Sequence, residues 1–252
     1  MISSSPLGEG VWEINLFGNK NRIVMTKPKA IFNWSSGKDS SMALYKVLQE
    51  DKYDIQCLMT SINSHHDRIS MHGVRTALLE KQAESIGIPL HKLLLPEIPS
   101  MEEYSKILGD AMVTFKLEGM EYSIFGDIFL EDLKIYREEQ LAKVGLKGVF
   151  PIWKQPTRQL METIIDAGFK AIVVCVDDRC LDKSFVGRLL DRDFLRDISE
   201  NVDPCGENGE YHSFVFDGPI FSKPVPFTIG EVVYKTYNQL DKSYGFYYCD
   251  LM

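Results

Sequence analysis

Ala30-Ile-Phe-Asn-Trp-Ser-Ser-Gly-Lys-Asp-Ser-Ser41 joins an apolar run of strand length to a serine-rich turn. A helical pattern follows at once, with apolar residues at positions 43, 44, 47 and 48. Small residues let the backbone turn tightly, and the free N–H groups at the start of a helix attract anions. The stretch therefore predicts an anion-binding loop between the first strand and the first helix.

The side chains of this loop suit a polyphosphate. Lys38 supplies a cation, and Asp39 is a candidate to hold Mg²⁺ on a bound phosphate chain. The predicted phosphate-binding residues are Ser35, Ser36, Gly37, Lys38, Asp39 and Ser40. A Walker A loop is excluded because Asp39 follows Gly37-Lys38 where Ser or Thr is required. The alternative interpretation is an ordinary serine-rich helix cap.

Apolar strand-length runs alternate with helical patterns from Lys29 onward, which is typical of a parallel sheet covered by helices. We expect strands at 30–34, 55–62, 91–95, 122–125 and 148–152, in the order 3-2-1-4-5 of a doubly wound Rossmann-like sheet. The first helix is expected to carry the apolar face at 43, 44, 47 and 48, and the next three are expected near 73–86, 104–115 and 131–144.

The pattern changes after Pro151. A helix at 157–167 and the apolar run 171–176 still look like buried parallel sheet. Beyond them, 199–225 is rich in turn residues, and 227–237 and 244–248 are strand-like without intervening helices. We predict a tail at 1–26, a nucleotide-binding domain at 27–150 and a smaller α+β domain at 151–252. A peripheral strand is an equal alternative for part of the tail.

Ligands of such sheets bind beyond the carboxyl ends of the strands, where the strand order reverses. The ends flanking the first strand carry Ser61 and the pair Gly126-Asp127. Gly126 allows close backbone approach, and Asp127 could position Mg²⁺, a ribose hydroxyl or a proton of the nucleophile. A helix cap is the alternative role for Asp127.

Three histidines at 65, 66 and 72 could suggest a metal site, but no Cys or carboxylate completes a recognised ligand spacing around them. We therefore assign no metal to them. His72 and Arg75 are interpreted as a loop that faces the α-phosphate or the second substrate. Solvated loop histidines are an equally good alternative.

A second dense motif runs from Asp203 to Pro219, with two glycines bracketing Glu207 and Asn208. We expect Gly206, Glu207, Asn208 and Glu210 to bind substrate, and Glu210 and His212 to share one face of the following strand and act as acid/base groups. The alternative is a hairpin turn with rim charges.

Both motifs resemble known families. Residues 35–40 are similar to the SGGxDS loop of the PP-loop ATP pyrophosphatases, with Ser36 in place of the first glycine. Residues 206–215 are similar to the GENGEYHTFV signature of the diphthine–ammonia ligase family within that group, with Ser213 in place of Thr. Gly126-Asp-Ile128, Pro151-Ile-Trp153 and Gly187–Asp191 match further family motifs.

The resemblance implies a HUP-type nucleotide-binding fold and a ligase that uses ATP and Mg²⁺. Such an enzyme adenylates a carboxylate, diphthine on elongation factor 2, and ammonia then displaces AMP. It implies catalytic roles for Lys38, Asp39, Asp127, Glu210 and His212. Two alternatives stay open: a PP-loop enzyme with another acceptor, such as tRNA or a small molecule in a bacterium, and a non-catalytic ATP sensor of the universal-stress type.

Composition limits the partners. The 252 residues carry a net charge of −8, which argues against a broad nucleic-acid surface. No run is long and apolar enough to suggest a membrane span. Five scattered cysteines, an odd number without a CxxC pair, indicate reduced thiols in the cytoplasm. The sequence leaves a homodimer open.

Overall fold

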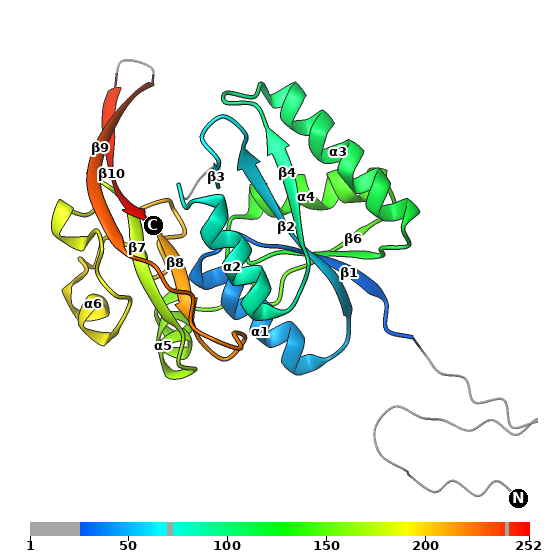
Figure 1. Cartoon of the computed structure of the whole chain (residues 1–252), viewed down its shortest axis with the longest axis horizontal. Helices are drawn as coiled ribbons and strands as arrows, with labels where there is room; N and C mark the ends of the chain where they lie inside the picture. The colour runs from blue at the N-terminus through cyan, green and yellow to red at the C-terminus, as the bar shows by residue number, and fades with distance from the viewer. Residues whose placement is uncertain (1–25, 70–72, 240–241) are drawn as a thin grey trace, which may run out of the picture.

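The computed structural model describes residues 26–69, 73–239 and 242–252. Its first sheet is built around β1 (Lys29–Asn33), which pairs in parallel with β2 (Asp54–Asn63) on one side and β5 (Tyr122–Ile124) on the other. β4 (Leu90–Leu95) continues the sheet beyond β2, and β6 (Lys147–Val149) continues it beyond β5. The predicted order of five parallel strands is confirmed (Figure 1). A two-residue strand, β3 (Arg68–Ile69), adds an antiparallel pairing to the end of β2.

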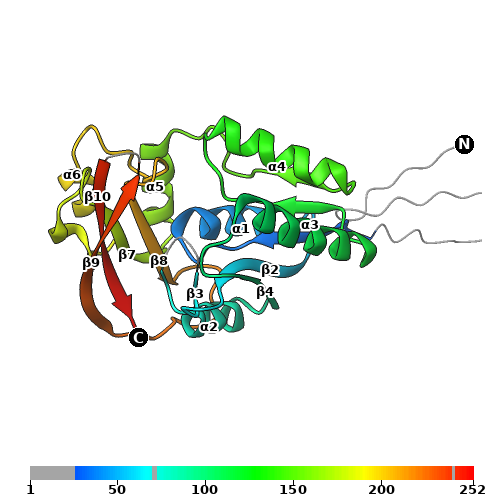
Figure 2. The ribbon, with the colours of Figure 1, turned by 90° about the horizontal axis from the view of Figure 1, so that it is seen from above.

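Helices cover both faces of this sheet (Figure 2). They are α1 (Lys38–Glu50), α2 (Thr76–Ile86), α3 (Met101–Leu117) and α4 (Glu131–Lys143). One apolar cluster joins Ile31 and Met59 of the sheet to Met112 and Phe115 of α3 and to Leu141 of α4. A larger cluster on the other face contains the buried side of α1 and α2. The apolar periodicity of the sequence thus produces a doubly wound layer structure.

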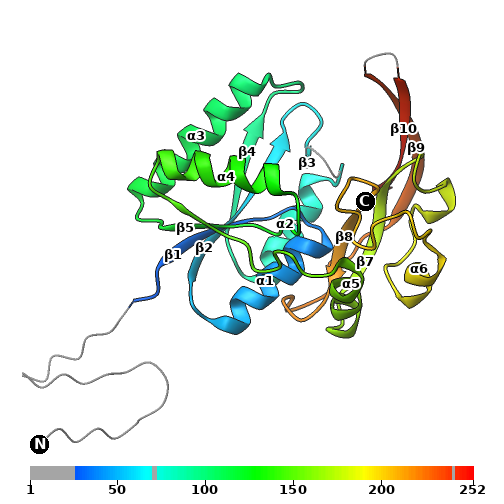
Figure 3. The same ribbon diagram turned by 180° about the vertical axis from the view of Figure 1, so that it is seen from behind.

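A second, antiparallel sheet has the order β8-β7-β10-β9. Its strands are β7 (Lys170–Asp177), β8 (Tyr211–Asp217), β9 (Ile229–Gln239) and β10 (Lys242–Leu251). The expectation that 171–176 belongs to parallel sheet was wrong, because β7 runs antiparallel to both β8 and β10. α5 (Thr157–Asp166), the 3-10 turn η1 (Lys183–Phe185) and α6 (Arg192–Asp197) accompany this sheet (Figure 3).

The two sheets share the larger apolar cluster, and buried hydrogen bonds join them. Gln82 of α2 accepts a hydrogen bond from Trp34 Nε1 at 3.0 Å and donates to the carbonyl oxygens of Ser36 and Val215. The Val215 N–H donates in turn to the Ser36 carbonyl at 3.0 Å. The loop after β1 is therefore held directly against β8 of the second sheet.

Part of the predicted organisation lies outside this description. The tail predicted at 1–26 falls almost wholly outside the described residues. The domain bounds 27–150 and 151–252 stay predictions, and the change from the first sheet to the second occurs between β6 and β7. Among the helices of the described ranges, none has both the length and the apolar character needed to cross a bilayer.

Candidate active site at the start of α1

The loop after β1 takes the backbone shape that an anion-binding turn requires. Ser36 has φ 71°, in the left-handed region that glycine adopts most easily. Ser36 occupies the position of the first glycine in the SGGxDS loop that this segment resembles. Its carbonyl accepts hydrogen bonds from Gln82 Nε2 and the Val215 N–H, which hold the serine in this conformation. Gly37 is the N-cap of α1 and offers no side-chain cap to the first N–H groups of the helix. The alternative interpretation of the loop as an ordinary serine-rich cap is thus not what the geometry favours.

The serine hydroxyls are arranged around the Gly37 carbonyl. Ser40 Oγ and Ser41 Oγ both donate to it, at 3.0 and 2.9 Å, and Ser35 Oγ donates to Ser40 Oγ at 3.0 Å. The Ser36 hydroxyl is buried and has no hydrogen-bond partner among the described residues. An unpartnered buried hydroxyl beside an uncapped helix start fits a polar ligand.

The buried Lys38 forms an ion pair with the partly buried Asp39, with Lys38 Nζ 2.9 Å from Asp39 Oδ2. The ammonium also lies 4.9 Å from the centre of the Tyr211 ring. Burial alone lowers the pKa of Lys38, but the charge interactions of the ammonium, the largest of them with Asp39, together raise it above its usual value, so the ammonium keeps its charge. Burial raises the pKa of Asp39, against the opposing effect of Lys38. Asp39 Oδ1 is buried without a hydrogen-bond partner among the described residues, so this oxygen is available to coordinate a metal ion.

Gly126 and Asp127 lie beside this helix start, as the strand order predicts. A Cβ on Gly126 would stand 2.9 Å from Ser40 N, so the close approach that the glycine allows is that of the α1 backbone. Asp127 pairs with Arg137 of α4, whose Nε lies 2.7 Å from Asp127 Oδ2. Burial raises the pKa of Asp127, and the Arg137 charge opposes this rise.

The second motif reaches the same place from the other sheet. Glu207 Oε1 accepts hydrogen bonds from the N–H groups of Ile128, at 2.8 Å, and Phe129, at 3.4 Å. Ser213 Oγ accepts from the Lys38 N–H at 3.2 Å. Burial raises the pKa of Glu207 to about 7, although the Ile128 N–H acts in the opposite direction. The segments 35–41, 126–128 and 207–213 therefore form one cluster.

Not every predicted residue points into that cluster. Glu210 is buried and accepts from the Asp203 N–H, the Asn208 N–H and Asn208 Nδ2, each at 3.0 Å, so its carboxylate organises its own turn. Gly206 has φ 66° and lies against the Tyr211 ring, where a Cβ would stand 2.8 Å from it. These contacts show that Glu210 and Gly206 stabilise the turn itself, and their substrate-binding role stays a prediction.

His212 neighbours Cys175 across the pairing of β8 with β7. Burial lowers the pKa of His212 to about 4, and the Lys38 charge adds to this effect, so the imidazole is neutral near pH 7. Ser61 lies near the carboxyl end of β2, opposite Leu93 of β4. The acid/base role of His212 and the nucleotide-binding role of Ser61 stay predictions, and a pKa of about 4 does not favour proton transfer by His212 near pH 7.

The predicted substrate loop is only partly described. His72 lies outside the described residues. The Arg75 guanidinium is held by Asp250 of β10, with Arg75 Nε 3.0 Å from Asp250 Oδ1, and Arg68 pairs with the same carboxylate. Arg75 thus ties α2 to the second sheet, and its substrate-binding role stays a prediction.

Two groups near the cluster carry no local sequence signal. Arg137 comes from within α4, where nothing in the neighbouring residues marks it as the partner of Asp127. Cys205 is buried, its thiol donates to the Thr157 carbonyl at 3.3 Å, and burial raises its pKa. Cys205 lies within the motif from Asp203 to Pro219, but nothing in its spacing marks it as a neighbour of the Lys38–Asp39 pair.

Family models identify the chain. The N-terminal domain model of diphthamide synthase matches residues 28–148, and the C-terminal domain model matches residues 156–247. The chain belongs to the diphthamide synthase family. The two matches of this family contain all three segments of the cluster, so the predicted resemblance is confirmed.

Curated relatives agree with the family models. Proteins named diphthine–ammonia ligase are 25% identical over 170 residues in Homo sapiens and 28% identical over 169 residues in Danio rerio. These matches cover 62% and 60% of this chain, and 64% and 65% of the relatives. A relative of the same name in Schizosaccharomyces pombe is 31% identical over 100 residues, which is 38% of this chain and 16% of that protein. The chain thus spans less than two thirds of the length of these relatives.

Proposed function

We propose that this protein is an ATP-dependent ligase that joins ammonia to the carboxylate of diphthine and releases AMP and pyrophosphate. The acceptor would be diphthine on elongation factor 2. The observation that carries the proposal is the convergence of segments 35–41, 126–128 and 207–213 at the uncapped start of α1. Membership of the diphthamide synthase family and the names of the curated relatives support the same activity.

In this proposal the start of α1 binds the pyrophosphate end of ATP. The N–H groups of the first turn other than that of Lys38, the Ser36 hydroxyl and the positive helix end would hold the phosphate oxygens while charge builds up on the leaving pyrophosphate. The unpartnered Asp39 Oδ1 fits a Mg²⁺ ion, a cation that prefers oxygen ligands and is commonly held by one or two carboxylates and substrate phosphates. Bound there, Mg²⁺ would supply further charge stabilisation.

Glu207 is the group best suited to the ammonia step. Its pKa of about 7 lies near neutral pH, where a group with such a pKa is well suited to accept a proton and later release it. Its position, bound to the N–H groups that follow Asp127, joins the second sheet to the nucleotide side of the cluster. We infer that Glu207 accepts a proton either from ammonium before attack or from the positively charged nitrogen formed when ammonia adds to the acyl-adenylate, and that Asp127 with Arg137 helps to orient the acceptor.

The alternatives are less well supported. A PP-loop enzyme with a tRNA or small-molecule acceptor and a non-catalytic ATP sensor are both disfavoured by the family match, which extends over the second sheet as well as the first. The five cysteines are all free thiols, which supports a cytoplasmic location as part of the proposal.

The proposal is tested by incubating the purified protein with ATP, Mg²⁺, an ammonium salt and a diphthine-bearing protein. We expect AMP and pyrophosphate to form in equal amounts, together with an acceptor lighter by the difference between a hydroxyl and an amino group. Omission of the acceptor should suppress turnover. Formation of ADP, or AMP formation with no change in the acceptor, would rule the proposed reaction out.

A further inference from the structure

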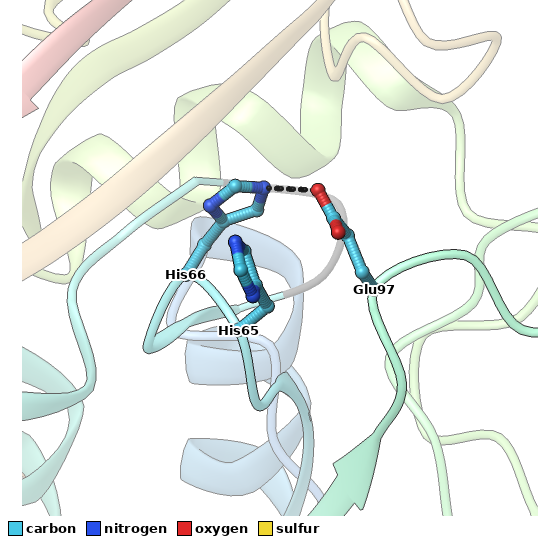
Figure 4. A group of neighbouring side chains, drawn as sticks. All are labelled: His65, His66 and Glu97. Carbon is cyan, nitrogen blue, oxygen red and sulfur yellow. Dashed lines mark ion pairs between the residues drawn. The ribbon is translucent and has the colours of Figure 1, made fainter.

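Two histidines and a glutamate gather outside the cluster around α1, and their role is independent of the proposed ligase activity. His65 and His66 follow β2, whereas Glu97 follows β4. Each residue offers one ligand atom, and these atoms all lie within 4.8 Å of one another. Figure 4 shows the three side chains facing a common space. We propose that they form a binding site for a divalent transition-metal ion of the zinc type.

The distance between two of the ligand atoms already suits such an ion. His66 Nε2 lies 3.2 Å from Glu97 Oε1. In a tetrahedral zinc site with bonds of about 2.1 Å, neighbouring ligand atoms lie about 3.4 Å apart. The ligand atom of His65 lies within 4.8 Å of those of His66 and Glu97, and the two rings stand nearly perpendicular with their centres 4.9 Å apart, so His65 must move closer for all three to bind one ion.

The backbone on both sides of the site is fixed by one residue, Asn63. Its Oδ1 accepts from the N–H groups of His65, at 3.0 Å, and His66, at 3.1 Å. Its Nδ2 donates to the Glu97 carbonyl at 3.0 Å. The Ser64 N–H and hydroxyl both donate to the Leu95 carbonyl, each at 2.9 Å, and tie the same two segments together. The backbone that carries the ligands is therefore held before an ion arrives, which reduces the entropy cost of binding.

The ligand types select the class of metal. Imidazole suits Zn²⁺, Cu²⁺ and Ni²⁺, whereas Mg²⁺ and Ca²⁺ prefer an all-oxygen set. About half of the His66 and Glu97 side chains is exposed, so an ion can enter from solvent and keep water on its open positions. Sequence reasoning missed this site because the carboxylate comes from another strand end, which no local ligand spacing reveals.

The experiment is a calorimetric titration of Zn²⁺ into the full chain in the presence of excess Mg²⁺. All proteins carry Cys180→Ser, because Cys180 is the exposed one of the five cysteines and could bind zinc by itself. We expect one zinc ion per chain in the parent. His66→Ala and Glu97→Gln should each weaken binding by about tenfold or more, as loss of a ligand or its orienting group does. His91→Ala removes an exposed histidine on β4 outside the cluster and should leave the affinity unchanged.

A second readout separates a built site from loose surface binding. Co²⁺ in place of Zn²⁺ should give the visible absorption of a tetrahedral or five-coordinate ion in the parent and in His91→Ala, and should lose it in His66→Ala. Asn63→Ala keeps all three ligands but should weaken zinc binding by about 10- to 100-fold, because it removes the hydrogen bonds to the backbone of all three ligand residues and leaves only the Ser64 contacts between the two segments. Absence of zinc binding in the parent, or equal affinity in His66→Ala and His91→Ala, would overturn the proposal.

Discussion

At the scale of single residues, substitution of Asp39 in the Lys38–Asp39 pair is the most direct test of the proposed nucleotide site. Asp39→Asn keeps the shape of the side chain but removes the charge proposed to hold Mg²⁺. We expect AMP formation to fall by about 10²- to 10³-fold, the typical effect of losing one preorganised electrostatic group. Stability should fall as well, by about 3–5 kcal/mol, because a buried ammonium loses its counter-charge. Urea unfolding and initial rates of AMP release measure the two effects.

Two further variants separate activity from folding. The double variant Lys38→Met/Asp39→Asn removes both charges of the pair and should recover most of the stability while staying inactive. Asp51→Asn changes an exposed aspartate at the C-cap of the same helix and should leave both properties unchanged. If the double variant regains activity together with stability, the role assigned to Asp39 is wrong.

Glu207 makes the stability of the protein depend on pH. Its pKa is about 7 in the folded chain, against about 4.3 in an unfolded one, so the folded state binds the proton more tightly. Between these two values stability falls as pH rises, by at most about 1.4 kcal/mol per pH unit and by less for a partly exposed group. Glu207→Gln should remove this decline, so that the variant gains stability relative to the parent between about pH 5 and pH 8.

The comparison is made by urea unfolding of both proteins at several pH values. The difference between them cancels the contribution of His212, whose pKa of about 4 produces the opposite trend, a loss of stability as pH falls. Glu200→Gln, at an exposed position, should follow the parent throughout. A constant difference between Glu207→Gln and the parent would show that Glu207 does not titrate in this range.

At the scale of elements, the contact between the end of β5 and the start of α1 depends on Gly126. Gly126→Ala would put a methyl group 2.9 Å from Ser40 N, and backbone atoms cannot yield as a flexible side chain can. We expect a loss of about 1–3 kcal/mol and a displaced phosphate loop with a higher KM for ATP. Gly109→Ala, on α3 with open space around it, should instead stabilise the protein by about 0.5–1 kcal/mol. Equal effects of the two substitutions would contradict the close approach.

The elements also show how far sequence reasoning reaches. The parallel strands and their order were predictable because each apolar run is followed by a helical pattern and the right-handed crossover leaves few topologies. β7 was misinterpreted because seven of its eight residues are buried, the usual sign of parallel sheet. Its burial arises instead because the shared cluster includes α1 and α2 of one half as well as α5 and α6 of the other. A local run of apolar residues cannot tell which neighbours cover it.

At the scale of the whole molecule, the same limit applies to the site. The motifs at 35–41 and 206–213 were identifiable through their resemblance to family signatures, because their residue types alone are equally typical of a helix cap or an ordinary hairpin turn. Contacts between them, such as that of Glu207 with the Ile128 N–H, depend on how the two sheets dock, and no periodicity encodes that docking. For this reason the Lys38–Asp39 ion pair and the Arg137 contact appear only in three dimensions.

Gln82 provides the test of that docking. Gln82→Met preserves the volume but leaves the Trp34 Nε1–H and the Val215 carbonyl without the partner they have now, whereas Ser36 keeps the Val215 N–H. At about 1–3 kcal/mol for each buried group left unpaired, we expect a loss of about 2–6 kcal/mol. Gln159→Met, at an exposed position of α5, should stay within about 0.5 kcal/mol of the parent.

Urea unfolding followed by fluorescence and by circular dichroism measures both the size of this loss and the coupling of the two sheets. Because they share one apolar cluster, the parent should unfold in a single transition with coincident curves. In Gln82→Met the first probe to change should be tryptophan fluorescence, since Trp34 loses its partner at the junction itself. A parent with two separate transitions, or a Gln82→Met variant as stable as Gln159→Met, would mean that the start of α1 and the second sheet are held together by other contacts.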